Sequence, residues 1–256
     1  MSVHLRHWPG DPDRPALALH PMMGSGAIWG PIAERLGGRV DLRAFDFPSH
    51  GRSSKWQPED GVDYHTTVTR LAAGMIDRPL DLIGHSLGAT VALRIAARAP
   101  HAIRSLTLIE PVLFAAAPGA APGLPPEAIA AAEAGDMEAA ARSFVGLWGA
   151  PGGFDALPPI VRDTAIRQMP LIIDADPALS GDIHGILRPG GLEAIEAPVL
   201  FISGQDSPPA IHRIAESLAQ RLPDVGRATV PGAGHMAPLT HPDAVAGLIG
   251  VNLDRG

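Results

Sequence analysis

Short apolar runs alternate with segments of helical periodicity along most of this chain, and no other feature constrains the fold as strongly. Helical patterns occupy residues 27–36, 64–76, 87–99, 209–222 and 242–253. The apolar runs between them, which we interpret as buried strands, lie at 16–20, 40–47, 80–84, 105–110 and 198–204, with weaker candidates at 2–8 and 227–232. Apolar strands joined by helices form parallel sheets that are covered on both faces. The sequence therefore predicts an α/β fold with a mostly parallel central sheet of about 7–8 strands and helices on both faces.

Residues 112–195 interrupt this alternation. They contain no convincing strand, but helical patterns at 125–135, 136–148 and 157–169 are separated by Pro- and Gly-rich joints. The segment also carries apolar residues, among them Phe144, Leu147, Trp148, Ile160 and Met169, which disordered linkers lack. We therefore expect an α/β core made of residues 1–111 and 196–256. Residues 112–195 are expected to form a helical cap inserted between two strands of the sheet.

The composition excludes several classes of site and partner. The 256 residues include no cysteine, so disulfides and thiolate metal sites are excluded. The 20 Lys and Arg residues are scattered and the net charge is −7, which argues against nucleic acid or an anionic membrane surface as a partner. We find no signal-peptide pattern and no apolar run of the roughly 18 residues that a membrane span needs. We expect a cytoplasmic monomer or homodimer that acts on a small molecule.

A serine stands at the junction of a predicted strand and a predicted helix. The strand 80–84 ends at Gly84, Ser86 and Gly88 follow, and the helix 87–99 begins there. This is a G-x-S-x-G pattern in a strand–turn–helix context, in which a strained turn holds the serine out at the carboxyl edge of the sheet. Parallel sheets bind ligands at that edge, and the helix N-terminus suits a developing oxyanion. The pattern predicts that Ser86 is a nucleophile.

Four motifs in a fixed order resemble those of the α/β-hydrolase fold superfamily, and the resemblance covers nearly the whole chain. Residues 17–29 resemble the H-G-containing loop after the third strand, and 45–54 resemble the D-x-x-G-H-G-x-S loop after the fourth. Residues 84–88 match the nucleophile turn, and 230–245 resemble the segment that carries the catalytic histidine. The resemblance implies a serine hydrolase, carboxylesterase-like, with a helical cap.

A serine hydroxyl needs a base to become an effective nucleophile. His235 follows a Gly-rich loop directly after the last predicted strand and comes after the serine in the chain order of this fold, so we predict that it is the base. We interpret His85 and His50 as structural residues that make hydrogen bonds, and His20 as an anchor of the loop that follows it. His184, within residues 112–195, is a weaker candidate for a residue that faces substrate.

Two carboxylates can supply the acid that orients this base. Asp206 lies in the loop where the family most often places its acid, but the usual spacing is G-x-x-D, and the residue three after Gly204 is Ser207. Glu110 is the only charged residue of its apolar run and precedes Pro111, which favours an extended backbone. A carboxylate buried at a strand end needs a partner. We favour Glu110 and keep Asp206 as the alternative.

The resemblance also implies an oxyanion hole made of two backbone N–H groups, which we assign to Leu87 and Met22. The chain departs from the family here, because Pro21 replaces the usual glycine after the loop histidine. Proline has no N–H to donate, so the donor shifts to Met22, with Met23 as a further possibility.

Apolar residues near these motifs predict the lining of a substrate pocket: Met22, Met23, Trp29, Leu87, Leu113, Phe114, Trp148 and Met236. Such a pocket favours an uncharged acyl compound. No Gly-rich phosphate loop or metal-ligand cluster occurs, so we expect neither a cofactor nor a metal.

The predicted function is hydrolysis of a small, largely apolar carboxylic ester through an acyl-enzyme. A serine in place of an aspartate nucleophile argues against haloalkane and epoxide chemistry. Hydrolysis of a C–C bond, a lactone or a thioester on the same scaffold is an alternative. A non-catalytic small-molecule binding protein of this fold is a second alternative, from a different class.

Overall fold

The computed structural model describes residues 2–120, 123–149 and 152–256 of the chain. Within these ranges, seven strands form one sheet in the order β1-β3-β2-β4-β5-β6-β7. β1 runs antiparallel to β3 at one edge, and all other pairings are parallel. The strands are β1 (Leu5–Trp8), β2 (Pro15–Leu19), β3 (Asp41–Phe45), β4 (Leu80–His85), β5 (Ile103–Ile109), β6 (Val199–Gly204) and β7 (Val225–Val230). The predicted mostly parallel sheet is confirmed, and the two weaker candidate strands form its edges.

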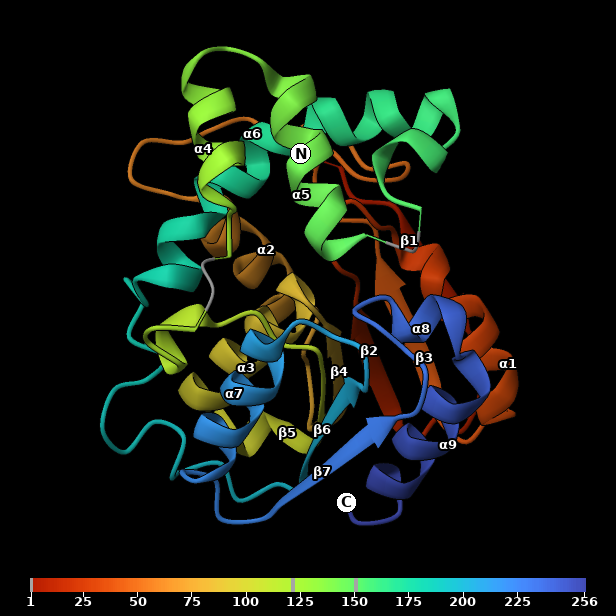
Figure 1. The fold of residues 1–256 in the computed structure, drawn as a ribbon. Helices are drawn as coiled ribbons and strands as arrows, with labels where there is room; N and C mark the ends of the chain where they lie inside the picture. Colours follow the sequence, from red (N-terminus) through yellow and green to blue (C-terminus); the bar gives the residue numbers. More distant parts are fainter. Residues whose placement is uncertain (1, 121–122, 150–151) are drawn as a thin grey trace.

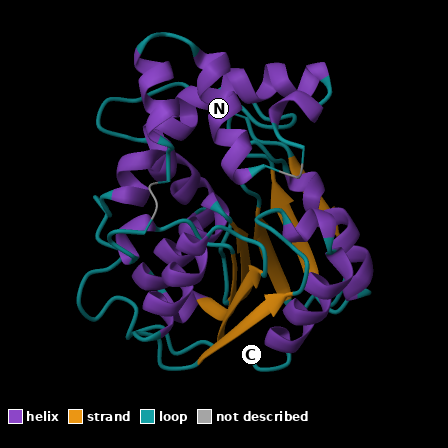
Figure 2. Ribbon diagram, viewed as in Figure 1, coloured by secondary structure: helices purple, strands orange, loops and turns teal. Residues whose placement is uncertain are grey.

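Helices cover both faces of this sheet (Figure 1 and Figure 2). The α-helices of the described ranges are α1 (Gly30–Leu36), α2 (Tyr64–Ala73), α3 (Leu87–Arg98), α4 (Pro126–Glu133), α5 (Met137–Trp148), α6 (Pro159–Ser180), α7 (Pro209–Ala219), α8 (Ala237–Thr240) and α9 (Pro242–Leu253). Short 3₁₀ helices are η1 (Gly26–Trp29), η2 (Pro100–Ala102), η3 (Phe114–Ala116) and η4 (Phe154–Ala156).

The alternating side chains of the central strands divide the core into two layers. In β6, Phe201 packs into one buried cluster while its neighbours Leu200 and Ile202 pack into another. Successive side chains of a strand point to opposite faces, so the two clusters lie on opposite sides of the sheet. The first cluster includes residues of α2, α3 and α7, and the second includes residues of α1 and α9. Because both faces are covered, the central strands β2, β4 and β6 are buried along their whole length.

Local sequence signals set several helix boundaries. Asp63 caps α2 by accepting a hydrogen bond from the Thr66 N–H at 2.6 Å, and Asp136 caps α5 in the same way from Ala139 at 2.9 Å. α1 ends at Gly37, whose φ of 59° is the left-handed conformation that glycine adopts without strain. The predicted helix 27–36 begins as the 3₁₀ helix η1 and is α-helical only from Gly30 to Leu36.

Between β5 and β6, helices α4, α5 and α6 lie beyond the strand ends at the top of Figure 1, and residues 181–198 return to β6 without a helix. α4, α5 and α6 share a buried cluster of their own, which includes Leu124, Val145, Phe154 and Met169. The pattern predicted at 157–169 is part of the longer α6, which continues past Pro170 because its next apolar residues remain buried. The division into a core of 1–111 and 196–256 and a cap of 112–195 stays a prediction.

Candidate active site

Ser86 occupies a strained turn between β4 and α3. Its φ of 55° is a conformation that side-chain-bearing residues rarely adopt. A Cβ on Gly84 would lie 2.4 Å from the carbonyl oxygen of Gly88, and a Cβ on Gly88 would lie 2.3 Å from the carbonyl oxygen of Leu19. Both positions therefore require glycine, which lets the turn pack closely against the sheet. The strained backbone holds the Ser86 side chain at the carboxyl end of β4.

Three side chains from distant parts of the sequence form one chain of hydrogen bonds. The Ser86 Oγ lies 3.0 Å from His235 Nε2, and His235 Nδ1 lies 2.9 Å from Glu110 Oε2. Ser86 and His235 are each 7% exposed and Glu110 is fully buried. A carboxylate only accepts hydrogen bonds, so His235 carries its proton on Nδ1 and leaves Nε2 free to accept from the serine. The arrangement can remove the hydroxyl proton of a nucleophile.

The loop after β6 supplies donors to the Glu110 carboxylate. Its Oε1 accepts hydrogen bonds from the Gly204 N–H at 2.6 Å and from the Ser207 hydroxyl at 2.8 Å. The backbone of Glu110 has a φ of 52°, and its N–H donates to the carbonyl of Ile202 at 2.9 Å. With the histidine, three donors thus surround this buried carboxylate, which satisfies a charge that would otherwise be costly to bury.

Asp206 is exposed, and the ion pair of His235 is with Glu110 instead. Its backbone N–H donates to the carbonyl of Ala233 at 2.8 Å, so the loop after β6 is tied to the loop that carries the histidine. Ser207, one residue later, is buried and faces Glu110. Of the two candidate acids, the structure brings Glu110 to the histidine and leaves Asp206 at the surface.

The backbone N–H groups of Met22 and Leu87 are available to an oxyanion, because within the described ranges neither donates to an acceptor of the protein. Leu87 is the first residue of α3, where N–H groups have no partner inside the helix. The Met23 N–H, in contrast, donates to His50 Nε2 at 3.1 Å. Met23 is therefore occupied, and Met22 is the better placed of the two neighbouring residues.

Two buried histidines fix the loop that contains Met22. His20 Nδ1 donates to the carbonyl of Pro21 at 2.7 Å, while its Nε2 accepts from the Phe47 N–H at 2.8 Å. Burial holds the pKa of His20 well below its usual value, and it lowers the pKa of His50 to about 4. Both rings are therefore neutral near pH 7, so each can accept the backbone hydrogen bond that it receives.

The remaining candidate histidines lie outside the hydrogen-bonded chain. His85 Nε2 donates to the carbonyl of His235 at 2.8 Å, and burial, with the nearby His235, lowers the pKa of His85 to about 3. His184 contacts Asp63 at 2.7 Å and the Thr66 hydroxyl at 3.2 Å. His184 therefore ties its segment to the start of α2 and does not line a pocket at the serine.

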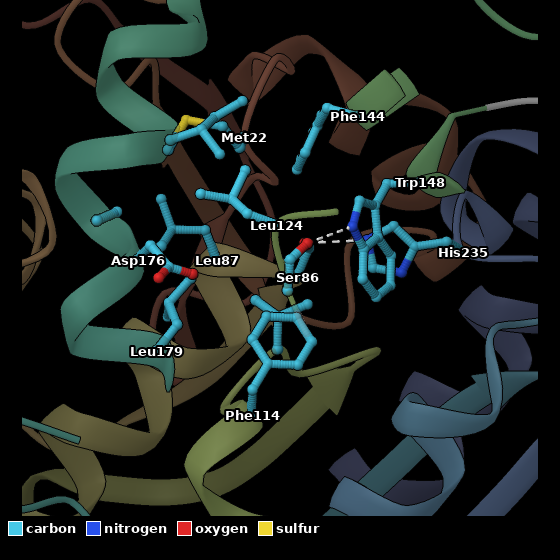
Figure 3. A pocket seen from close by; sticks show the side chains of 14 residues that line it. Met22, Ser86, Leu87, Phe114, Leu124, Phe144, Trp148, Asp176, Leu179 and His235 are labelled. Carbon is cyan, nitrogen blue, oxygen red and sulfur yellow. Dashed lines mark hydrogen bonds between the residues drawn. The ribbon is translucent and has the colours of Figure 1, made fainter. Parts of the chain in front are cut away.

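Two pockets, which we call the inner and the outer pocket, meet at Ser86 and His235. Figure 3 shows the inner pocket. Counting space open to solvent, the inner pocket has a volume of about 430 Å³ and the outer pocket about 880 Å³. The inner pocket is lined by Met22, Ser86, Leu87, Val112, Phe114, Gly123, Leu124, Phe144, Trp148, Ile172, Ala175, Asp176, Leu179 and His235. The outer pocket is lined by Pro21, Met22, Met23, Ser86, Phe144, Val145, Trp148, Gly149, Leu157, Val161, Thr164, Ala165, His235, Met236 and Leu239.

Two predicted pocket residues lie elsewhere. Trp29 is fully buried in the core cluster that α1 and α9 share, so it does not line either pocket. Leu113 is also fully buried and packs into the cluster on the opposite face of the sheet, although its neighbours Val112 and Phe114 line the inner pocket. The other predicted lining residues do face a pocket: Met22, Met23, Leu87, Phe114, Trp148 and Met236.

None of the residues that α6 contributes to the two pockets was predicted from the sequence. Ile172, Ala175, Asp176 and Leu179 all line the inner pocket. Their spacing of three, four and seven residues marks one face of a helix, and this signal was present in the sequence. No group of His, Asp and Glu side chains in the described ranges is arranged to hold a metal ion, and none of the helices there is long and apolar enough to cross a membrane.

The chain is similar to known hydrolases over most of its length. The profile described as "Alpha/beta hydrolase family" matches residues 16–248. A pimeloyl-(acyl-carrier protein) methyl ester esterase of Methylococcus capsulatus is 29% identical over 88% of this chain and 88% of its own length. An N-formylmaleamate deformylase of Pseudomonas putida is 30% identical over 94% of this chain and 89% of its own. The crystal structure of an enol-lactonase from Burkholderia xenovorans LB400 superposes with a TM-score of 0.75 at 21% identity, covering 98% of this chain and 96% of that one.

Proposed function

The chain belongs to the alpha/beta hydrolase family, and we propose that, as a carboxylesterase-like hydrolase of this family, it cleaves small, largely apolar carboxylic esters through an acyl-enzyme on Ser86. The observation that carries this proposal is the hydrogen-bonded chain from Ser86 through His235 to Glu110 at the junction of two apolar pockets. An intact chain of this kind favours turnover over the alternative of a binding protein, since a binding protein has no use for an activated serine.

In the proposed first step, His235 Nε2 takes the proton of the Ser86 hydroxyl as Oγ attacks the ester carbonyl. The imidazole then carries a positive charge, which the Glu110 carboxylate stabilises from Nδ1. The buried position of Glu110 strengthens this interaction, because few water molecules screen it. His235 next gives its proton to the departing alcohol oxygen, and the acyl group stays on Ser86.

The negative charge that develops on the carbonyl oxygen requires donors that are already in place. The N–H groups of Leu87 and Met22 are proposed for this role because neither has an acceptor in the described protein. The hydrogen bond from His20 to the Pro21 carbonyl orients the peptide unit that contains the Met22 N–H. Removal of one such donor in other enzymes costs about 3–4 kcal/mol of transition-state stabilisation.

The two pockets suit the two halves of an ester. The alcohol oxygen must lie beside His235 to receive its proton, and the outer pocket is lined by Met236 and Leu239 on that side. In Figure 3, Leu87, Asp176 and Leu179 of the inner pocket lie on the opposite side of Ser86 from His235. We therefore assign the acyl group to the inner pocket and the alcohol to the outer one.

The three relatives are named for an ester, an N-formyl compound and an enol-lactone. A serine acyl-enzyme mechanism serves all of these reactions, because each begins with attack on a carbonyl carbon. The ester is our proposal for this chain because both pockets have mostly apolar linings, which suit an acyl chain and an uncharged alcohol. The second step is attack of water on the acyl-enzyme, with His235 again as the base.

The proposal is tested by incubating the protein with nitrophenyl esters of short fatty acids and, separately, with a fluorophosphonate. We expect ester hydrolysis and a covalent adduct on the peptide that contains Ser86. Ser86→Ala is expected to abolish the adduct and to reduce kcat by a factor on the order of 10⁵–10⁶. Retention of activity in Ser86→Ala, with the variant folded by circular dichroism, would overturn the proposal.

A further inference from the structure

The inner pocket contains one side chain that its apolar lining does not explain. Apart from Ser86 and His235, Asp176 is the only polar side chain among the described residues that line it. The other lining residues are glycine, aliphatic, aromatic or methionine. Asp176 is half-buried, and Figure 3 places it on the far side of the pocket from His235. Among the described lining residues outside the hydrogen-bonded chain, this carboxylate is the group that can accept a hydrogen bond from, or pair with a positive charge on, a molecule that enters.

The position of Asp176 on α6 shows that its side chain belongs to the pocket. Ile172, Ala175, Asp176 and Leu179 form one face of the helix, and all four line the cavity. Ser180, one residue past this face, donates its hydroxyl to Asp176 Oδ1 at 2.9 Å. This bond restricts the rotation of the carboxylate and leaves Oδ2 available as an acceptor.

The Asp176 carboxylate has no basic partner in the described part of the chain. Among the described residues, no Arg, Lys or His nitrogen forms an ion pair with Asp176. A neighbouring acid of the same helix is different, because Asp174 accepts a hydrogen bond from the Tyr64 N–H at 2.6 Å and thereby joins α6 to α2. Asp174 thus has a structural partner, whereas Asp176 directs an unpaired charge toward the cavity.

We propose that Asp176 is a specificity residue, which selects acyl groups whose far end carries a hydrogen-bond donor. An ammonium or a hydroxyl at that end would bind Oδ2, and the ammonium would also gain from the opposite charge. A carboxylate at the same place would meet a like charge and is disfavoured. This inference rests on the proposed function, because it assigns the acyl chain to the inner pocket.

The test uses nitrophenyl esters that differ only at the end of a six-carbon acyl chain. Caproate ends in a methyl group, ε-hydroxycaproate in a hydroxyl, ε-aminocaproate in an ammonium and adipate in a carboxylate. For the wild type, we expect kcat/KM to be highest for the ammonium ester, lower for the hydroxyl ester and lowest for the adipate monoester. The ammonium and adipate esters are expected to differ by about 30-fold, because attraction and repulsion at a half-buried charge each contribute about 1 kcal/mol.

Asp176→Asn provides the decisive comparison, because an asparagine keeps an oxygen that can accept the Ser180 hydroxyl while it removes the charge. We expect the preference for the ammonium over the adipate ester to fall to about threefold, while kcat/KM for the caproate ester changes by less than about threefold. Asp163→Asn is the matched control: Asp163 is an exposed acid of the same helix, and its loss should leave the preference unchanged.

The possible results distinguish the proposed role of Asp176 from the proposed esterase function. If the caproate ester is hydrolysed but the preference is the same in the wild type and Asp176→Asn, the role of Asp176 is wrong and the esterase proposal stands. An equal loss of preference in Asp163→Asn would likewise overturn it, since the effect would then come from net charge alone. If the wild type hydrolyses none of the esters and Ser86 is not labelled, both proposals fail.

Discussion

The ends of two neighbouring strands, β5 and β6, each carry an acidic residue close to the histidine loop, and only one of these acids reaches the histidine. Glu110 directly follows β5, is fully buried and contacts His235. Asp206, two residues after β6, is exposed. The residue beside it, Ser207, donates to Glu110 instead. The end of β6 therefore supplies donors, and the end of β5 supplies the acceptor.

This difference shows that a carboxylate needs a prepared environment as well as a suitable place in the sequence. A buried charge is tolerated only where donors satisfy it. Gly204 and Ser207 provide such donors at the end of β6, and the positive φ of Glu110 turns its side chain toward them. Within the described ranges no donor is bonded to the Asp206 carboxylate, and this side chain lies in solvent. Five predictions test this contrast.

Replacement of the buried acid is expected to have the largest effect. Glu110→Gln keeps the shape of the side chain but removes the charge that holds the proton on His235 Nδ1. We expect kcat for ester hydrolysis to fall by about 10³–10⁴-fold, the loss observed when the acid of a serine triad is made an amide. Steady-state kinetics with a nitrophenyl ester measure it. A loss of less than tenfold would show that Glu110 is dispensable.

A double substitution tests whether the acid that orients His235 can be moved from the end of β5 to the loop after β6. Glu110→Ser combined with Ser207→Asp places a carboxylate three residues after Gly204 and a hydroxyl at the end of β5. We expect the double variant to be about 10–100-fold more active than Glu110→Ser alone, as expected for residues that act as a pair. Equal activity of the double and single variants would mean that the end of β6 cannot direct an acid to His235.

Removal of one donor should have a smaller effect. Ser207→Ala deletes the hydroxyl that donates to Glu110 Oε1 but leaves the Gly204 N–H in place. A lost hydrogen bond to a charged group corresponds to about 1.5–3 kcal/mol. We expect kcat to fall by about tenfold, because fewer hydrogen bonds then hold the Glu110 carboxylate in place beside His235. An unchanged kcat would contradict the positioning role of Ser207.

His85, at the end of β4, is a buried titratable residue that can be compared with the buried Glu110. Burial lowers the pKa of His85 to about 3, whereas in the unfolded chain it is near the usual 6.5. Below pH 6.5 the unfolded state therefore binds one more proton at this residue. His85 then lowers the free energy of unfolding by up to about 1.4 kcal/mol for each further pH unit toward the folded pKa. Full stability from this group is present above pH 6.5 and is lost as the pH falls.

Urea unfolding between about pH 7 and pH 5 measures this dependence. We expect the slope of the unfolding free energy against pH to decrease by up to one proton in His85→Gln, whose amide can still donate to the His235 carbonyl. Burial also lowers the pKa values of His20, His50 and His65. These three residues therefore still contribute to the pH dependence of the unfolding free energy in the variant. An identical slope in wild type and variant would show that His85 is charged or exposed.

Replacement of the exposed acid is expected to have the smallest effect. Asp206→Asn changes a side chain that lies in solvent and leaves the Asp206 backbone N–H bound to Ala233. We expect kcat and KM to stay within about twofold of the wild type, as is usual for surface substitutions. A tenfold loss of kcat would place the acid in the loop after β6 and would contradict the contrast between the two strand ends.

The sequence alone predicted the parallel sheet, the strained serine turn and the histidine loop, because each has a strong local signal. Ser86 stands between a strand and a helix with glycines on both sides, and His235 follows a Gly-rich loop. The choice between Glu110 and Asp206 depends on which loop supplies donors. This is a matter of contacts between β5 and β6, which no local pattern records.

The pocket was harder to predict, because an apolar residue near a motif can face either side of the sheet. Trp29 belongs to the core on one face and Leu113 to the core on the other, although Leu113 stands between two residues that line the inner pocket. α6 was expected to end near Met169, so the lining that follows Pro170 was not considered. Asp176 lies in that missed part of the helix, as a polar residue on its otherwise apolar pocket face.

The rate at which a fluorophosphonate labels Ser86 tests the central claim most directly, because this reaction requires the activated serine but no particular substrate. Intact-mass measurements would follow the labelling of the wild type, Glu110→Gln and Asp206→Asn at equal probe concentration. We expect the wild type and Asp206→Asn to react at rates within about twofold of each other, and Glu110→Gln to react at least about 100-fold more slowly. Fast labelling of Glu110→Gln together with slow labelling of Asp206→Asn would contradict the account.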